Sequence, residues 1–347
     1  MNFAKRIYYL LVLVIVVVLL IYAQSLLIPF VVAMIIWFII RILKKGLRRI
    51  PWIDSWPQWL LTLLSTVVLI SLLGLTVTLI SNNIQELSDS LPKYQENIKV
   101  VSKQINESLN IDLAESLTTY LEDFDFMGIL SNLFSALTSL FGDAFLVIIY
   151  LIFILLEEPI FPGKIRAIYN TPERHKHALE LLEKIDRSTS SYMAIKTLMS
   201  LLTGILSFIV LRIIGVDAAF FWAFLIFLLN YIPAIGSIIA TLFPAVFAML
   251  QFGDILHPVL VLSIVGIIQV LIGNFLEPRV MGNTLNISTL VVFLTLAVWG
   301  AIWGVIGMLL SVPITVILIL VLSEIPTTRS IAILLSKRGD PGSSGNG

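Results

Sequence analysis

Long apolar runs with few charges dominate this sequence and restrict what it can fold into. A helix needs about 20 consecutive apolar residues to cross the hydrocarbon core of a bilayer, and such runs recur along the chain as far as residue 322. Hydrophobic residues make up 58% and charged residues 13% of the 347 positions, whereas soluble domains are about half apolar and a quarter charged. The sequence therefore predicts an all-α polytopic membrane protein.

Six runs have a length near that expected of single membrane helices. They are residues 7–23, 26–40, 60–80, 141–156, 197–214 and 258–275. Two further runs, 217–250 and 285–322, are too long for one span, short for two with a loop, and interrupted near the middle. About eight hydrophobic segments are therefore expected, and each long run is either one kinked helix or a re-entrant hairpin.

Basic residues predict the orientation, because short cytoplasmic loops of membrane proteins are enriched in lysine and arginine. Five basic residues lie within 41–49, and seven lie within 160–196. This distribution predicts cytoplasmic N- and C-termini, and a tight turn at Gln24–Ser25 on the outer side. The side on which Arg279 lies depends on whether the long runs are hairpins.

Residues 81–140 form the one long hydrophilic stretch, with nine acidic residues and three lysines. Ile98, Val101, Ile105 and Leu109 recur at helical spacing, which predicts at least one amphipathic helix. We expect a small helical extracytoplasmic insert, either a solvated spacer or an element of gating or assembly. The expected layout is 1–80 membrane helices, 81–140 insert, 141–158 membrane helix, 159–196 cytoplasmic loop and surface helix, 197–323 transport half, and 324–347 cytoplasmic tail, disordered from Gly339.

Polar interruptions in the C-terminal half mark the candidate solute path. Asn230, Tyr231 and Pro233 break the first long run, and Gly236 follows. Proline frees the carbonyl one turn earlier, and non-helical backbone at membrane depth is tolerated only inside protein or along a cavity. The amides and freed carbonyls suit a small, uncharged, hydroxylated solute.

A second interruption follows the span 258–275. Gln269 and Glu277 share a helix face there, and Asn274 and Arg279 lie beside it. A carboxylate at bilayer depth is costly unless it is paired or solvated. Glu277 and Arg279 are therefore expected either to clamp a polar ligand across the turn at Pro278 or to cap the helix at the interface.

Small residues and prolines supply candidate hinge and packing positions. Gly300, Gly304, Gly307 and Ser311 recur at spacings that place them on one face of a straight helix. A further stripe, Lys196, Ser200, Thr203 and Ser207, is typical of helix packing, with a polar lining as the alternative. The candidate hinge or packing set is Pro278, Gly282, Gly300, Gly304, Gly307 and Pro313.

Signatures of enzymes and cofactor sites are missing from the sequence. There is no cysteine, no P-loop and no His-Glu-x-x-His motif. His175 and His177 do not share a helix face. We therefore expect neither an enzyme nor a metal or other cofactor, and the zero formal net charge gives no reason to expect nucleic acid.

Four stretches carry a resemblance to a known family. They are Leu229–Pro233 with Gly236 and Ser237, Gly273–Gly282, and Ser288–Leu294, followed by Gly307–Pro313. With them the sequence resembles the AI-2E family of autoinducer-2 exporters over about residues 1–335. The resemblance implies export of the furanosyl quorum-sensing signal autoinducer-2 across a bacterial inner membrane by a homo-oligomer, pentamers included.

Three functions are weighed. The first is a secondary transporter or facilitator that exports a small polar signal, most specifically autoinducer-2. The second is a cation/proton antiporter, such as a sodium/proton antiporter, with Glu277 as the proton carrier, an activity that the family resemblance also implies for some members. The third is a membrane scaffold that acts through its external insert. The expected partners are the solute, the lipid bilayer and further copies of the chain.

Overall fold

The structure, a computed structural model, describes residues 3–90, 94, 97, 144–168, 171–282 and 287–337. Over these residues the elements are helices, with one isolated β-bridge between Ile287 and Ser336. Six helices are long and apolar enough to cross a membrane, or up to seven with one bent pair. The predicted all-α polytopic architecture is confirmed.

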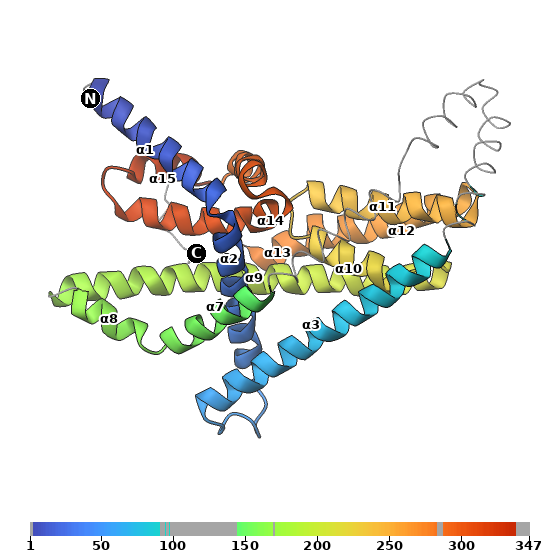
Figure 1. Ribbon diagram of the computed structural model, residues 1–347, viewed down its shortest axis with the longest axis horizontal. Coiled ribbons are helices and arrows are strands. Elements are labelled where there is room, and N and C mark those ends of the chain that lie inside the picture. Colours follow the sequence, from blue (N-terminus) through green and yellow to red (C-terminus); the bar gives the residue numbers. More distant parts are fainter. Residues whose placement is uncertain are drawn as a thin grey trace. The chain divides into compact units, whose positions relative to one another are not determined.

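The chain, drawn as a ribbon in Figure 1, divides into two compact units. The first contains residues 1–65, 141–194 and 281–347, and the second contains residues 66–140 and 195–280. The predicted amphipathic helix at 98–109 and the predicted disordered tail from Gly339 lie outside the described residues.

In the first unit, helices α1 (Phe3–Tyr22) and α2 (Gln24–Leu47) follow each other almost without interruption. Only Ala23 departs from helical geometry, and α2 continues away from α1 instead of folding back beside it (Figure 1). The prediction of a tight turn at Gln24–Ser25 is therefore wrong. The amide of Leu27 still bonds to the carbonyl of Ala23, so the backbone needs only a kink to pass this point.

The next elements of this unit are α7 (Ala144–Glu157), which packs beside α2, and α8 (Phe161–Ile168), which is bent from α7 by 63°. Phe30 of α2 and Tyr150 of α7 meet edge to face, with ring centroids 5.6 Å apart. This geometry is one that aromatic pairs prefer. The bend between α7 and α8 contains Glu158, which belongs to a cluster of charged residues in this unit.

Helix α14 (Thr289–Glu324) turns back on itself at Gly304, where φ is 62° and ψ is −142°. A Cβ placed on Gly307 would lie 1.9 Å from the carbonyl oxygen of Trp299. In a straight helix, residues eight apart would be separated by about 12 Å. Gly300, Gly304 and Gly307 therefore form the turn of a helical hairpin, and the predicted single packing face is wrong.

The hairpin of α14 packs through an aromatic core. Trp299, Trp303 and Leu310 are buried, and apolar residues of α1 and α2 cover them. The Trp303 indole also donates a hydrogen bond to the carbonyl of Leu20, 3.1 Å away, just before the kink at Ala23. Pro313 is buried in the second limb, and the unit ends with α15 (Arg329–Leu335).

Helices α3 (Gln58–Asp89) and α9 (Pro172–Ile214) each contribute residues to both units. With 43 residues, α9 is about 64 Å long, roughly twice the thickness of a bilayer core. We expected a surface helix from Pro172 and a separate membrane span from Thr197. They are one continuous helix, since no glycine or proline interrupts residues 173–203.

The second unit contains another helical hairpin, made by α10 (Ala219–Leu229) and α11 (Ile235–Phe252). A Cβ on Gly236 would lie 1.8 Å from the carbonyl oxygen of Leu229, so the two limbs meet at their backbones and only glycine fits. Of the two forms left open for the long runs, each run adopts the hairpin path within its own unit.

After α11, the chain reverses into α12 (Leu256–Val270), which packs along α11 (Figure 1). It then continues as a π-helix, η1 (Leu271–Leu276), and as α13 (Glu277–Met281). We expected this helix to end near Asn274, but it runs to Met281. Pro278 cannot donate a hydrogen bond back to Asn274, and the wider π-turns before it accommodate that missing bond.

A polar network in the second unit contacts the segment just before α10 and the last turn of α11. The Asn97 amide donates to the carbonyls of Leu250 and Gln251 at the end of α11, at 3.0 and 2.7 Å. Tyr94 donates to Asp217 at 2.9 Å, and burial raises the pKa of the Tyr94 phenol, which keeps it a donor. Because helix ends leave carbonyls without partners, this network fixes where α10 begins and α11 ends.

Candidate solute site

A stripe of polar side chains along α9 forms the base of the candidate site. Lys196, Ser200, Thr203 and Ser207 are all buried, at 0–6% exposure. Their spacings of 4, 3 and 4 place them on one helix face. Buried polar groups normally need hydrogen-bond partners, and the first residues of the stripe find theirs on the neighbouring elements of the second unit.

Three polar contacts join one turn of α9 to two other elements. The Lys196 ammonium lies 2.6 Å from the Glu277 carboxylate at the start of α13. The Tyr231 hydroxyl donates to Thr197 Oγ1 at 2.7 Å. The Asn230 amide donates to Ser200 Oγ at 3.1 Å. The two interruptions predicted from the sequence therefore converge on the same turn of α9.

Packing within the second unit explains this convergence. Helix α12 packs along α11, with Gly266 facing Thr241, and the chain then continues through η1 to Glu277 at the start of α13. Gly236, at the start of α11, meets the carbonyl of Leu229, so Asn230 lies beside the start of α11. The break that ends α10 and the carboxylate that begins α13 therefore lie at the same end of the α11–α12 pair.

Strained backbone marks the tip of the α10–α11 hairpin. Ala234 has a φ of 59° and a ψ of −56°, and the amide of Ile235 bonds to the carbonyl of Pro233 at 2.7 Å. These values describe a γ-turn of the rare, strained type. Such strain costs roughly 1–3 kcal/mol and clusters at functional sites. Ala234 was not among the residues that sequence reasoning selected.

Gln269 adds a buried donor to the same helix that carries Glu277. It lies on the face of α12 that packs against α11, together with Val261 and Val265. The residue is 6% exposed, and its Nε2 atom has no hydrogen-bond partner. An unsatisfied buried amide costs about 1–3 kcal/mol, so this group can bind a hydrogen-bond acceptor that enters the site.

Two predicted site residues do not join this cluster. Asn274 and Arg279 are exposed, and Arg279 is not the partner of Glu277. The expected clamp between Glu277 and Arg279 is wrong, because Lys196 occupies that position. Sequence reasoning noted Lys196 in a polar stripe but left it out of the site, since its partner lies 81 residues further along the chain.

The hinge candidates have distinct roles. Gly282, with φ of 51°, follows the end of α13 in a left-handed conformation that favours glycine. Gly300 faces Met308 across the α14 hairpin, where an added Cβ would lie 2.9 Å from the methionine methyl. These positions shape turns inside their own elements.

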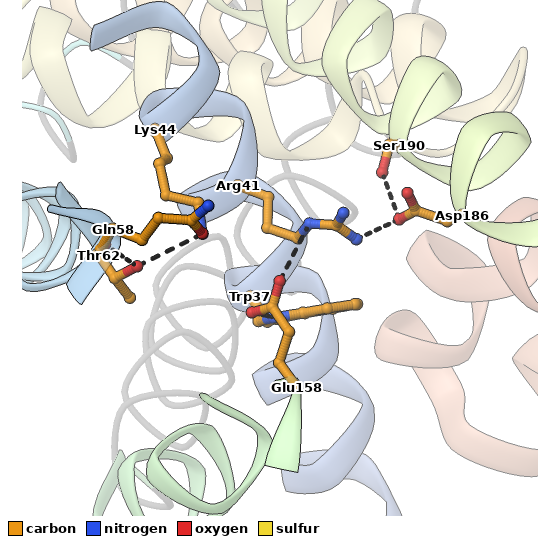
Figure 2. Close-up of polar contacts among 8 residues, drawn as sticks. All are labelled: Trp37, Arg41, Lys44, Gln58, Thr62, Glu158, Asp186 and Ser190. Carbon is orange, nitrogen blue, oxygen red and sulfur yellow. Dashed lines mark hydrogen bonds and ion pairs between the residues drawn. The ribbon is translucent and has the colours of Figure 1, made fainter. Parts of the chain in front are cut away.

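A different charged cluster lies in the first unit, where α2, α7 and α9 meet (Figure 2). Arg41 bonds to Asp186, and its Nε lies 3.5 Å from Glu158. The Trp37 indole donates to Glu158 at 2.8 Å, and the Arg41 guanidinium lies over its ring, 4.9 Å from the centroid. The three charged side chains are 24–29% exposed. Arg41 is thus held by both carboxylates and an aromatic face.

No group of three or more potential metal ligands occurs among the described residues. The fold defines a class of protein: a polytopic α-helical membrane protein with broken-helix hairpins. The match to the AI-2E family transporter model over residues 10–327 is more specific, and the chain belongs to that family.

Named relatives agree with this assignment. The AI-2 transport protein TqsA of Escherichia coli K12 is 33% identical over 321 residues, covering 91% of this chain and 90% of its own. A provisionally named transport protein of Haemophilus influenzae is 32% identical, covering 90% of each chain. The provisionally named transport protein YueF of Bacillus subtilis is 27% identical, covering 85% of this chain and 82% of its own.

Proposed function

We propose that this protein exports a small polar signalling solute, most specifically autoinducer-2, across a bacterial inner membrane. The observation that carries the proposal is the convergence of Asn230, Tyr231 and Glu277 on α9, at a break in otherwise apolar helices. A broken helix at membrane depth is typical of transporter binding sites. The relative TqsA is named an AI-2 transport protein, and that name supplies the candidate solute.

The donors and acceptors of the site favour a hydroxylated molecule. The amides Asn230 and Gln269 and the hydroxyls of Thr197, Ser200 and Tyr231 can each donate and accept hydrogen bonds. A furanosyl compound such as autoinducer-2 presents several hydroxyl and ether oxygens within a few ångströms. In the proposed cycle these oxygens replace the side-chain contacts that now hold α9 to the hairpin.

The assembly and orientation form part of the proposal. Charges in short loops favour cytoplasmic termini, and the family resemblance favours a homo-oligomer, with a pentamer as the expected form. The alternative of a cation/proton antiporter has one observation in its favour, the enclosed carboxylate of Glu277. It predicts sodium efflux that depends on a proton gradient and is lost in Glu277→Gln.

The test is efflux of autoinducer-2 from proteoliposomes that hold the purified full chain, with and without an imposed proton gradient. Asn230→Ala and Glu277→Gln should each lower the efflux rate at least tenfold. Asn274→Ala, which removes an exposed amide from the same span, is the matched control and should leave the rate unchanged. Gradient-stimulated efflux would indicate coupling, gradient-independent efflux a facilitator, and no efflux from well-folded protein would refute the proposal.

A further inference from the structure

Charge balance inside the candidate site points to a role for Lys196 that the proposed function does not require. Its ammonium and the Glu277 carboxylate lie 2.6 Å apart, with side chains 7% and 14% exposed. A second acid or base is not paired with either of them among the described contacts. The enclosed cluster therefore has paired charges and no net charge.

Each charge alone would attract a different ligand. A carboxylate enclosed among apolar helices, with no partner, needs a bound cation or a proton. An enclosed ammonium without a partner needs an anion. When the two neutralise each other, a neutral molecule with hydroxyl groups can bind without bringing a counter-ion.

Oxygen ligands suitable for a cation lie on and against the turn of α9 that carries Lys196. Thr197 and Ser200 lie within the same turn of α9 as Lys196, and Tyr231 and Asn230 reach that turn from the hairpin. Hydroxyl, amide and carboxylate oxygens are ligands that hard cations prefer. The Lys196 ammonium occupies the position at Glu277 that such a cation would take.

We propose that Lys196 determines the specificity of this site by serving as its resident cation. It makes the site selective for neutral, polyhydroxylated solutes and excludes sodium from Glu277. This inference rests on the proposed function for the neutral solute, but its prediction for sodium is independent of which solute is exported.

The experiment measures binding of ²²Na⁺ to purified full-length protein in detergent, and uptake of ²²Na⁺ into proteoliposomes. Wild-type protein should show background levels only. Lys196→Gln, which exposes the carboxylate, should raise both signals at least tenfold. Lys196→Arg keeps the charge and should remain at background, and the double variant Lys196→Gln/Glu277→Gln should return to background.

Controls separate specificity from misfolding and from failure of the proposed function. Size-exclusion profiles and thermal unfolding establish which variants are folded, and the double variant, with no unpaired charge, is the form best suited to fold. Lys164→Gln removes an ammonium that pairs with the exposed Glu157 and should have no effect on sodium.

Two results would overturn the inference. One is sodium binding by the wild-type protein at the level of Lys196→Gln. The other is background sodium binding by a folded Lys196→Gln protein. If wild-type liposomes fail to export autoinducer-2 while the sodium pattern holds, the solute assignment is refuted and the role of Lys196 stands.

Discussion

Each unit contains a helical hairpin formed within one of the two long apolar runs, and the two hairpins turn in different ways. The α14 hairpin turns at Gly304, a residue with no Cβ, and packs through Trp299 and Trp303 against apolar residues. The α10–α11 hairpin turns at Ala234 in a strained γ-turn and bonds through Asn230 and Tyr231 to polar groups. The α14 turn has glycine at its positive-φ position, whereas the α10–α11 turn has a strained alanine beside polar contacts. The difference supports the proposal that the solute site lies in the second unit.

The charged clusters of the two units also differ, in how far their side chains are exposed to solvent. Arg41 contacts two carboxylates and the Trp37 ring, and the charged groups are about a quarter exposed to solvent. Lys196 and Glu277 are a single, almost fully enclosed pair. Replacing a buried pair by apolar residues is often neutral or stabilising, whereas removing one partner is strongly destabilising. This contrast is consistent with a structural role for the Arg41 cluster and with the proposed role of the Lys196–Glu277 pair in solute selection.

The largest effect is expected from separating the enclosed pair. Glu277→Leu leaves the Lys196 ammonium without a partner and should reduce the free energy of unfolding by about 3–5 kcal/mol. Lys196→Met/Glu277→Leu should recover most of that loss. Thermal unfolding in detergent measures both. If the single variant is as stable as the double variant, the pair is not enclosed in the way that the contacts indicate.

The next effect compares the two turns directly. Gly304→Ala forces an alanine to a φ of 62° and ψ of −142° and should cost roughly 1–3 kcal/mol of unfolding free energy. Gly46→Ala is the matched control, because a Cβ there meets nothing within 4 Å. The measurement is again thermal unfolding. Equal stability of the two variants would show that the α14 turn does not depend on glycine.

Ala234→Gly should act with the opposite sign at the other turn. Glycine adopts positive φ freely, so the strain is relieved, and the gain is partly offset by the extra entropy of glycine in the unfolded chain, about 0.5–1 kcal/mol. We expect the free energy of unfolding to rise by about 0–2.5 kcal/mol. The efflux rate should nevertheless change severalfold, because the γ-turn positions Asn230 and Tyr231. An unchanged rate would mean that the strain has no role in transport.

Sequence reasoning predicted the all-α polytopic fold, but it selected only some of the residues that meet on α9, for a physical reason. Apolar run length indicates which helices can cross a membrane, and proline, asparagine and glycine mark breaks, so Asn230 and Gly236 were selected. Partners across the fold have no local signal. Lys196 lies at the end of the basic stretch 160–196, which predicts a cytoplasmic loop. No residue near Lys196 in the sequence indicates that Glu277 is its partner.

Turn geometry was only partly predictable for a related reason. The spacing of Gly300, Gly304 and Gly307 is compatible with a packing face on a straight helix and equally with a sharp reversal. Whether the reversal occurs depends on the tryptophans that pack on α1 and α2, which is tertiary information. A strained alanine such as Ala234 gives no signal at all, because alanine is ordinarily a helix former.

The smallest effect is expected from the Arg41 cluster. Glu158→Gln keeps a hydrogen-bond acceptor for the Trp37 indole and leaves Arg41 paired with Asp186. Solvent-accessible ion pairs contribute about 0–1 kcal/mol, and these side chains are about a quarter exposed, so the free energy of unfolding should fall by no more than that amount. The loss should shrink as salt rises, because solvent ions already screen this cluster. Thermal unfolding at low and high sodium chloride measures it. A loss as large as that of Glu277→Leu would show that the partly exposed Arg41 cluster and the enclosed Lys196–Glu277 pair contribute equally to stability. The proposal that the solute site lies in the second unit would then rest on the hairpin turns alone.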